Sequence, residues 1–328
     1  MQKKYIIFLS LLILIIAGCT SGKNNKVPDV GFIGGTEGLV PKLEIISSQP
    51  NEVLDNDVEP FQIALSLQNK GEHTVAANEV ITTLAGIDLN AFQIIEKDGV
   101  SKNLDQLEKL RKEGGNLIPA SETAIVYEAS YKYDEPTDKV QDLAVNFCYK
   151  YRTTATADAC LKKEVTRPST ESLCKIDDKK VVGNSGAPVS VFLLTERPAG
   201  KNQLTFTIQV KNNGKGDVYA QDFLSKGKCI EDQPMKNKLN VKVEFPDGNP
   251  VIKCGKLNDK NEGTISMIQN TASLSCTVDT STLQDSAFTK SLQVHLDYVY
   301  KDDVSTKLTI RSTAWGSWVH WITYQFII

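Results

Sequence analysis

An internal repeat constrains the fold of this chain more than any other feature of the sequence. Segment 62–71 (QIALSLQNKG) is matched 143 residues later by segment 205–214 (TFTIQVKNNG). In both, apolar residues alternate with polar ones and an Asn-x-Gly ends the run, as in a half-buried strand entering a turn. Segments 143–151 (LAVNFCYKY) and 292–300 (LQVHLDYVY) match at an offset of 149. The shared order and spacing predict two copies of one β-rich unit.

Each copy contains roughly 130 residues and several short alternating segments, as expected of a β-sandwich. We therefore predict an all-β fold with two tandem Ig-like β-sandwich domains after a signal peptide and a flexible tether. The predicted divisions are a signal peptide at 1–18, a tether at 19–40, sandwiches at 41–166 and 167–311, and an apolar Trp-rich tail at 312–328.

One helix is predicted within the first copy, at residues 103–112. Leu104, Leu107 and Leu110 recur there on one stripe. Gly114 and Gly115 follow, as expected at a helix end.

The N-terminus has the pattern of an export signal. Lys3 and Lys4 precede a 13-residue apolar run at 5–17. Such a run spans about 20 Å as a helix, less than the ~30 Å hydrocarbon core of a bilayer. A signal peptide therefore fits better than a spanning helix, and an uncleaved signal anchor is the alternative.

The apolar run ends in Ile16-Ala17-Gly18-Cys19, which resembles the lipobox of prokaryotic lipoproteins. The resemblance implies a lipid on Cys19 and attachment to the extracytoplasmic face of the cell membrane. Polar residues follow Cys19, as expected of a tether.

The six remaining cysteines predict three disulfides, because an even number in an exported chain indicates a disulfide framework. Two strands joined by a tight turn at 153–155 would place Cys148 opposite Cys160. Both members of Cys254–Cys276 lie in strand-like segments, and Cys174–Cys229 is the pair that remains. A zinc site is the alternative for the last four, but such sites use close pairs.

No reactive cluster is evident in the sequence. His73, His295 and His320 are the only histidines, and no two have metal-ligand spacing. We expect His73 to be solvated and His295 to lie on the polar face of a strand. Motifs of serine and zinc hydrolases are absent. We therefore predict no enzyme activity, no catalytic residue, no metal and no cofactor.

The acidic run 55–59 resembles the start of a calcium loop. Pro60 stands where such a loop requires Gly, so we interpret the run as an acidic turn. The net charge of the chain is −3, and no basic cluster follows the signal, which argues against nucleic acid as a partner.

The C-terminal tail is rich in aromatic residues, with Trp315, Trp318, Trp321 and Tyr324 recurring every three residues. On a helix, this stripe would suit a membrane interface or a partner's groove. The alternative is a terminal strand or helix docked on the second domain, or a disordered end.

Segments 32–39 (FIGGTEGL), 68–71 (QNKG) and 148–151 (CYKY) resemble those of uncharacterised archaeal cell-surface proteins with CARDB-type and other Ig-like β-sandwich domains. The resemblance covers most of residues 30–311 and implies a cell-surface role without a specific ligand.

We therefore expect a non-enzymatic surface lipoprotein whose sandwiches serve as spacers or binding modules for protein or envelope contacts. One alternative is a subunit of an envelope machine, such as a pilus or secretion assembly, that docks through the tail. Another is a hydrolase acting on extracellular glycan or peptide.

Overall fold

The structure is a computed structural model that describes residues 31–167, 173–176 and 178–314. Strands predominate in these residues, and the helical elements among them are three short 3₁₀ turns, η1 (Lys97–Gly99), η2 (Phe223–Lys226) and η3 (Gly255–Leu257). The all-β fold class is therefore confirmed. Among the same residues, no helix has the length and apolar character needed to cross a membrane.

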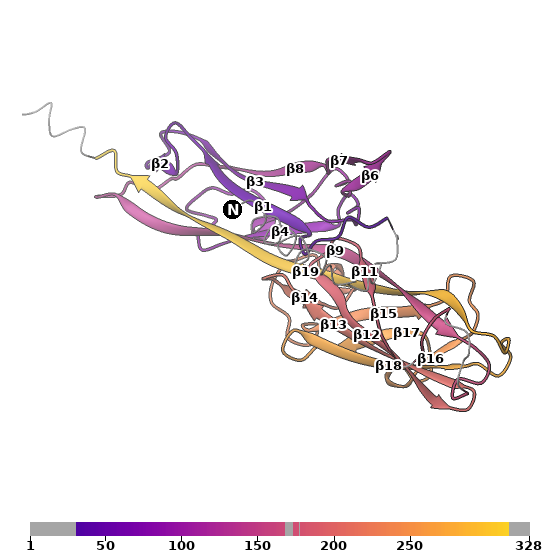
Figure 1. Cartoon of the computed structure of the whole chain (residues 1–328). Coiled ribbons are helices and arrows are strands. Elements are labelled where there is room, and N and C mark those ends of the chain that lie inside the picture. Colours follow the sequence, from indigo (N-terminus) through magenta and orange to yellow (C-terminus); the bar gives the residue numbers. More distant parts are fainter. Residues whose placement is uncertain (1–30, 168–172, 177, 315–328) are drawn as a thin grey trace, which may run out of the picture.

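A nine-stranded sheet runs along the molecule (Figure 1). Its centre is a ribbon of two long antiparallel strands, β9 (Lys139–Leu161) and β19 (Phe288–Arg311), and all 23 residues of β9 pair with β19. The other strands of this sheet are β2 (Glu52–Leu54), β4 (Val80–Ala85), β5 (Val100–Lys102), β11 (Val182–Asn184), β14 (Asp217–Tyr219), β15 (Lys238–Glu244) and β17 (Glu262–Ser266).

Two smaller sheets and one hairpin complete the fold. The three-stranded sheet contains β1 (Leu39–Ile46), β3 (Phe61–Asn69) and β8 (Glu122–Ala129). The five-stranded sheet contains β10 (Asp178–Lys180), β12 (Val189–Gly200), β13 (Gln203–Asn212), β18 (Thr271–Asp279) and β16 (Ile252–Cys254). The hairpin is formed by β6 (Arg111–Glu113) and β7 (Asn116–Ile118).

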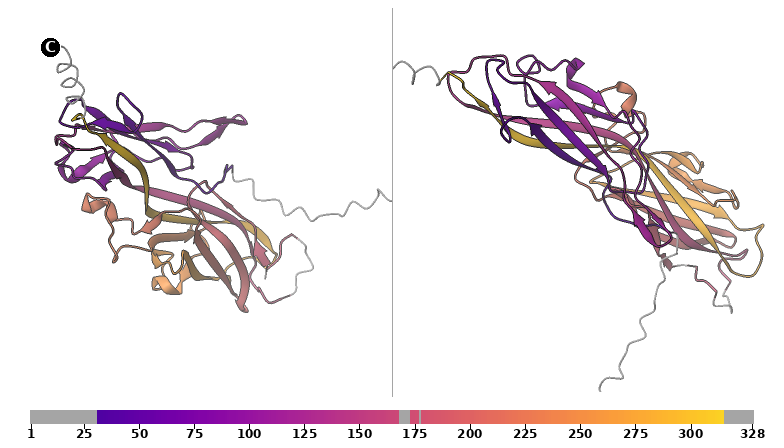
Figure 2. Two further views of the ribbon diagram at one scale, coloured as in Figure 1. Left: turned by 90° about the vertical axis from the view of Figure 1, so that its left-hand side faces the viewer. Right: turned by 90° about the horizontal axis from the view of Figure 1, so that it is seen from above.

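The small sheets lie near opposite ends of the ribbon, as the two views in Figure 2 also show. We call the N-terminal lobe the part formed by β1–β8, residues 139–150 and residues 299–311. The C-terminal lobe is formed by β10–β18, residues 150–161 and residues 288–299.

One face of the ribbon supplies the core of both lobes. The odd-numbered residues of β9 are buried from Leu143 to Leu161, with Phe147 in the N-terminal lobe and Ala157 in the C-terminal lobe. Successive side chains of a strand point to opposite faces, so both small sheets pack on the same face of β9. The larger apolar core therefore extends through both lobes.

The sequence repeat is also a repeat of strand pairing. Leu65 of β3 lies opposite Ile125 of β8, and the matching residues Ile208 and Leu274 lie opposite each other in β13 and β18. In the ribbon, Lys150 pairs with Val299, and these two positions are themselves 149 residues apart. An approximate two-fold axis therefore passes between them, and each long strand starts in one lobe and ends in the other.

The predicted turn at 153–155 is wrong, because these residues lie inside β9 and pair continuously with β19. Thr153 is buried and donates a hydrogen bond at 2.6 Å to the carbonyl of Val189, the first residue of β12, so its hydroxyl has a partner although the residue lies inside a strand. The predicted boundary between 166 and 167 consequently does not divide the strands, since each long strand contributes to both lobes.

The predicted helix at 103–112 is also wrong. Leu107 is buried and forms a β-bridge with Val75, whereas Leu104 is 83% exposed. The buried Asn103 side chain accepts a hydrogen bond from the N–H of Val80 and donates to two backbone carbonyls. These tertiary contacts hold the segment extended and outweigh the local helix preference that the leucine spacing indicated.

Candidate functional site

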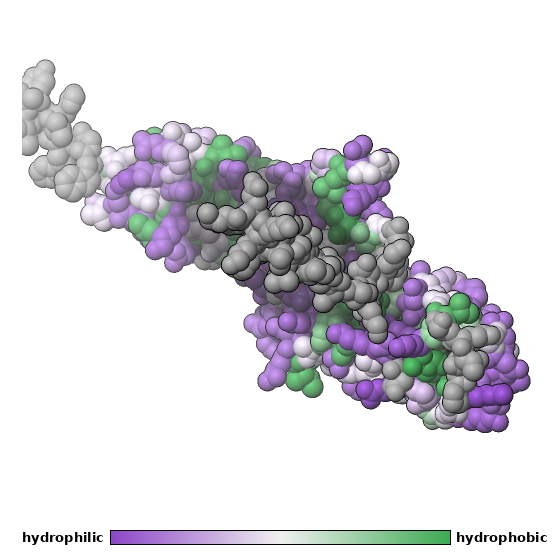
Figure 3. Space-filling view, in the orientation of Figure 1, coloured by the Kyte–Doolittle hydropathy of each residue, from purple (hydrophilic) through white to green (hydrophobic). Residues whose placement is uncertain are grey.

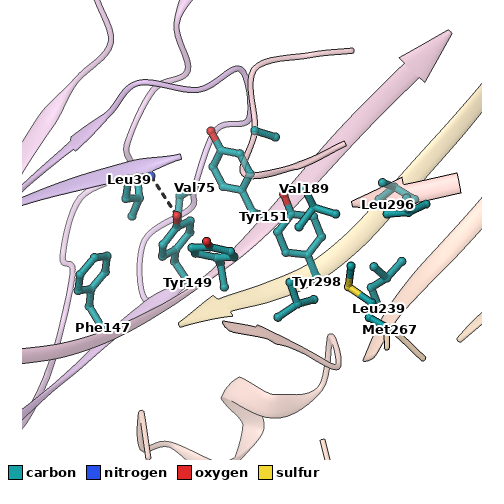
Figure 4. Packing of buried hydrophobic residues seen from close by; sticks show 14 of the residues in the cluster. Leu39, Val75, Phe147, Tyr149, Tyr151, Val189, Leu239, Met267, Leu296 and Tyr298 are labelled. Atoms are coloured by element: carbon teal, nitrogen blue, oxygen red, sulfur yellow. Dashed lines mark hydrogen bonds between the residues drawn. The ribbon is translucent and has the colours of Figure 1, made fainter. Parts of the chain in front are cut away.

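Four buried tyrosines occupy the centre of the ribbon, where the lobes meet. Figure 4 labels three of them, Tyr149, Tyr151 and Tyr298. Tyr149 lies opposite Tyr300, and Tyr151 lies opposite Tyr298. The ring centroids of these two pairs are 5.8 Å and 6.4 Å apart. Burial raises the pKa of all four hydroxyls, which keeps them neutral.

Two of these tyrosines bind the Asn-x-Gly turns that first revealed the repeat. Tyr151 donates a hydrogen bond to Asn69 Oδ1 at 3.0 Å, and Tyr300 donates to Asn212 Oδ1 at 3.4 Å. Each asparagine oxygen also accepts the N–H of the glycine two residues later. The two motifs of the repeat are therefore in contact in both copies.

A carboxylate joins the starts of the two copies at the same junction. The carboxylate of Glu72 accepts the N–H groups of Ile33 at 3.0 Å, Gly34 at 2.9 Å and Gly186 at 2.6 Å. The prediction of a flexible tether up to residue 40 is therefore wrong for residues 33 and 34, which are bound to the fold, and for Leu39 and Val40, which already belong to β1. The sequence contained no periodic signal that could have identified Glu72.

Three disulfides are present, and only Cys254–Cys276 has the predicted pairing. Cys148 bonds to Cys229 and Cys160 bonds to Cys174, so the predicted pairs Cys148–Cys160 and Cys174–Cys229 are wrong. Cys148 and Cys160 lie on the same continuous strand, where 12 residues span about 40 Å, far beyond the reach of a disulfide.

The Cys148–Cys229 bond ties the two lobes together. It attaches the loop that carries η2 to the face of the ribbon opposite the tyrosines, where Cys229 and Phe223 are buried in a second apolar cluster. Lys228 of this loop also pairs with Asp98 of the N-terminal lobe at 2.8 Å. The three disulfides indicate an oxidising, extracytoplasmic environment.

The acidic turn holds the last described residues at the tip of the N-terminal lobe. Asp55 is fully buried, and its carboxylate accepts the N–H of Glu135 at 2.7 Å and both the N–H and hydroxyl of Thr313, at 2.8 and 2.7 Å. Burial raises the pKa of Asp55, but these hydrogen bonds outweigh it and the net pKa is lowered.

Arg311 strengthens the same site. It makes two hydrogen bonds to the carboxylate of Glu52, at 2.8 and 2.7 Å, and one to Asp138.

Two groups of predicted site residues lie outside the described residues. They are the lipidation site Cys19 and the aromatic residues of the tail, Trp315, Trp318, Trp321 and Tyr324.

The two described histidines lie apart from each other. His73 is partly buried against the ring of Tyr151, so the expectation of a solvated side chain is wrong, and burial lowers its pKa. His295 lies between the Thr154 hydroxyl, 3.3 Å from Nδ1, and the Glu244 carboxylate, 3.5 Å from Nε2.

The row formed by Thr154, His295 and Glu244 is the reverse of a nucleophile triad, in which the hydroxyl bonds to Nε2 and the carboxylate to Nδ1. No group of three or more potential metal ligands comes together in the described part of the chain.

Comparisons with known proteins assign no family to this chain. No protein-family model matches it, and no curated protein matches it. Among solved structures, the secreted serine protease VesC from Vibrio cholerae matches at 9% identity, over 81% of this chain and 51% of that chain, with a TM-score of 0.20.

Two bacterial adhesins match with similar scores. InvE from Yersinia pseudotuberculosis matches at 11% identity, over 84% of this chain and 61% of that chain, with a TM-score of 0.16. The serine-rich repeat adhesion glycoprotein Srr1 from Streptococcus agalactiae matches at 9% identity, over 83% and 96%, with a TM-score of 0.17. This chain thus spans about half the length of the VesC chain and about three fifths of the InvE chain. Similarities at these TM-scores carry no argument about function.

Proposed function

We propose that this protein is a non-enzymatic lipoprotein of the cell surface that acts as a rigid spacer or binding module for protein or envelope contacts. The connection between its lobes carries this proposal. The ribbon, the four tyrosines and the Cys148–Cys229 bond hold the two ends of the molecule in one arrangement. The 23 residues of β9 alone span roughly 75 Å, a length suited to keeping two contact surfaces, one at each end, at a fixed separation.

The proposed anchor would attach near the middle of this rod. Gly34 is bound at the junction of the lobes through Glu72, and the chain between Cys19 and this point is short. A flexible segment of about 14 residues has an end-to-end distance of about 20 Å. Lipid on Cys19 would therefore hold the junction close to the membrane.

Changing Cys19 to Ser tests the anchor. We expect the variant to be released from the membrane fraction or to remain as an uncleaved precursor, whereas the neighbouring Ser21→Ala variant behaves as the wild type. The readouts are membrane fractionation and the mass of the mature chain. The decisive protein is a Cys19→Ser variant that also lacks residues 315–328. If this protein has the mature size and stays membrane-bound, the proposal is contradicted.

A second candidate, a subunit of an envelope machine, is favoured by the position of Thr313. Asp55 fixes this residue at the tip of the N-terminal lobe, so the Trp-rich segment begins at one end of the rod. Truncation after Ala314 keeps the contacts of Ser312 and Thr313. If the tail docks on a partner, the truncated protein should migrate as a smaller complex in native membrane extracts. An unchanged complex would exclude this role.

A further inference from the structure

A cleft of about 710 Å³ lies in the C-terminal lobe, away from Thr313. This volume is within the range of roughly 300–1,000 Å³ that is typical of ligand pockets. The cleft is lined by the β12–β13 turn, the loop before β16 and the end of β18, and its polar side chains include Asn202, Gln203, Asn249, Lys253, Asp279 and Thr282. In Figure 1, β16 and β18 lie at the end of the molecule opposite β2.

Strand pairing fixes the base of the cleft. Gln203 of β13 lies opposite Asp279 of β18, and Lys253 of β16 lies opposite Thr277 of β18. The Cys254–Cys276 bond holds β16 against β18 one residue further along. The side chains around the cleft therefore project from a sheet that is cross-linked at this point.

The side chains that line the cleft can form hydrogen bonds, and their charges sum to zero. The amide side chains of Asn202, Gln203 and Asn249 can each donate and accept hydrogen bonds. The Oδ1 atom of Asn202 is itself buried and has no hydrogen-bond partner among the described residues. Lys253 and Asp279 contribute one charge of each sign. Pro250 and Val251 add an apolar edge, and Val251 is 64% exposed.

We propose that this cleft binds a short neutral oligosaccharide. Sugar hydroxyls both donate and accept hydrogen bonds, as the amides do, and the C–H faces of a pyranose suit the apolar edge. The balanced charges do not favour a polyanion. The three residues of β16 offer little edge for an added peptide strand. Hydrophilic residues also predominate on the face of this lobe seen in Figure 3.

This inference rests on the proposed role as a binding module, because it names the class of ligand. Its test is nevertheless independent of the anchor. Binding is measured on the purified full-length chain in detergent, so a failure of the Cys19→Ser experiment leaves the sugar result unaffected, and the reverse also holds.

The probes are maltotriose, cellotriose and triacetylchitotriose, with trigalacturonate and a blocked neutral tetrapeptide as the competing ligand classes. Binding is detected by saturation-transfer NMR and quantified by titration. We expect at least one neutral trisaccharide to bind. We expect Asn202→Ala/Gln203→Ala to weaken this binding about tenfold, since two hydrogen-bonding side chains are lost.

The matched control is Gln221→Ala/Asn240→Ala, which removes two amides that line a separate polar hollow. This control should bind as the wild type does, and thermal unfolding should show that both double variants are folded. The proposal is overturned if no neutral trisaccharide binds, if both double variants bind equally well, or if only trigalacturonate or the peptide binds.

Discussion

Single residues at the junction of the lobes are both buried and hydrogen-bonded. Asn69 is fully buried, and its side chain connects Gly71, His73 and Tyr151. A buried polar group that loses its hydrogen-bond partner destabilises the folded state, because water cannot replace that partner in a buried site. The junction should therefore be sensitive to the removal of single atoms.

Replacing Tyr151 with Phe removes only a hydroxyl. We expect it to lower the free energy of unfolding by about 1–3 kcal/mol, because the bond to Asn69 is lost in a buried site. The matched change Tyr133→Phe alters a residue that is 46% exposed and should cost less than about 0.5 kcal/mol. Chemical denaturation measures both values, and equal losses would contradict the assigned role of Tyr151.

Asp55 should make the stability of the protein depend on pH. Its pKa in the folded state lies below the ordinary value of 3.8, so the unfolded chain takes up the proton first as the pH falls. The stabilisation by Asp55 is therefore complete above pH 3.8 and disappears as the pH falls through the lowered pKa.

Thermal unfolding between about pH 5 and pH 2 checks this linkage. We expect the wild type to lose more stability over this interval than Asp55→Asn, which has no carboxyl group to titrate at this position. Curves that stay parallel for the two proteins would show that Asp55 is not the group responsible.

Among the elements, the two long strands decide the disulfide pairing. The sequence around 153–155 contains several threonines, which suit a strand as well as a turn, and the alternating pattern continues on both sides. Only the partner strand β19, which pairs with every residue of β9, makes this stretch continuous. Because no turn brings Cys160 back to Cys148, Cys148 bonds to Cys229 instead.

The Cys148–Cys229 and Cys160–Cys174 bonds should differ in their effect on the free energy of unfolding. Cys148–Cys229 closes a loop of 81 residues and Cys160–Cys174 one of 14. Chain entropy gives contributions of about 4.5 and about 3 kcal/mol, respectively. We therefore expect Cys148→Ala/Cys229→Ala to destabilise the protein more than Cys160→Ala/Cys174→Ala.

Peptide mapping of a non-reduced digest checks the pairing itself. It should recover Cys148 linked to the peptide that contains Cys229. A peptide pair joining Cys148 to Cys160 would contradict the structure.

The whole molecule combines two repeats into one folded unit. Residues 155–161 complete the sheet of the C-terminal lobe, and residues 301–311 complete that of the N-terminal lobe. Neither lobe has a full set of strands without the other copy. Unfolding should therefore involve both lobes together.

Calorimetry of the full chain should show a single unfolding transition, with equal calorimetric and van't Hoff enthalpies. The reason is that separating the lobes would break the ribbon and divide the common apolar core. Two resolved transitions would mean that the lobes unfold independently. The experiment needs the disulfides intact, since reduction would itself break the link through Cys229.

The sequence by itself determined the all-β class, the repeat and the number of disulfides. These features follow from local patterns, such as alternation along residues 205–212 or the count of cysteines. The repeat also placed Tyr151 and Asn69 at positions equivalent to Tyr300 and Asn212, although it did not show that they touch.

Only the tertiary structure decided where strands continue, which cysteines pair and how the two copies share the ribbon. Each of these depends on contacts between distant residues, such as Lys150 with Val299 or Glu72 with Gly186. Local patterns around 103–112 and 153–155 were compatible with a helix and a turn. The free energy of burying Leu107 and of pairing β9 with β19 outweighed those local preferences.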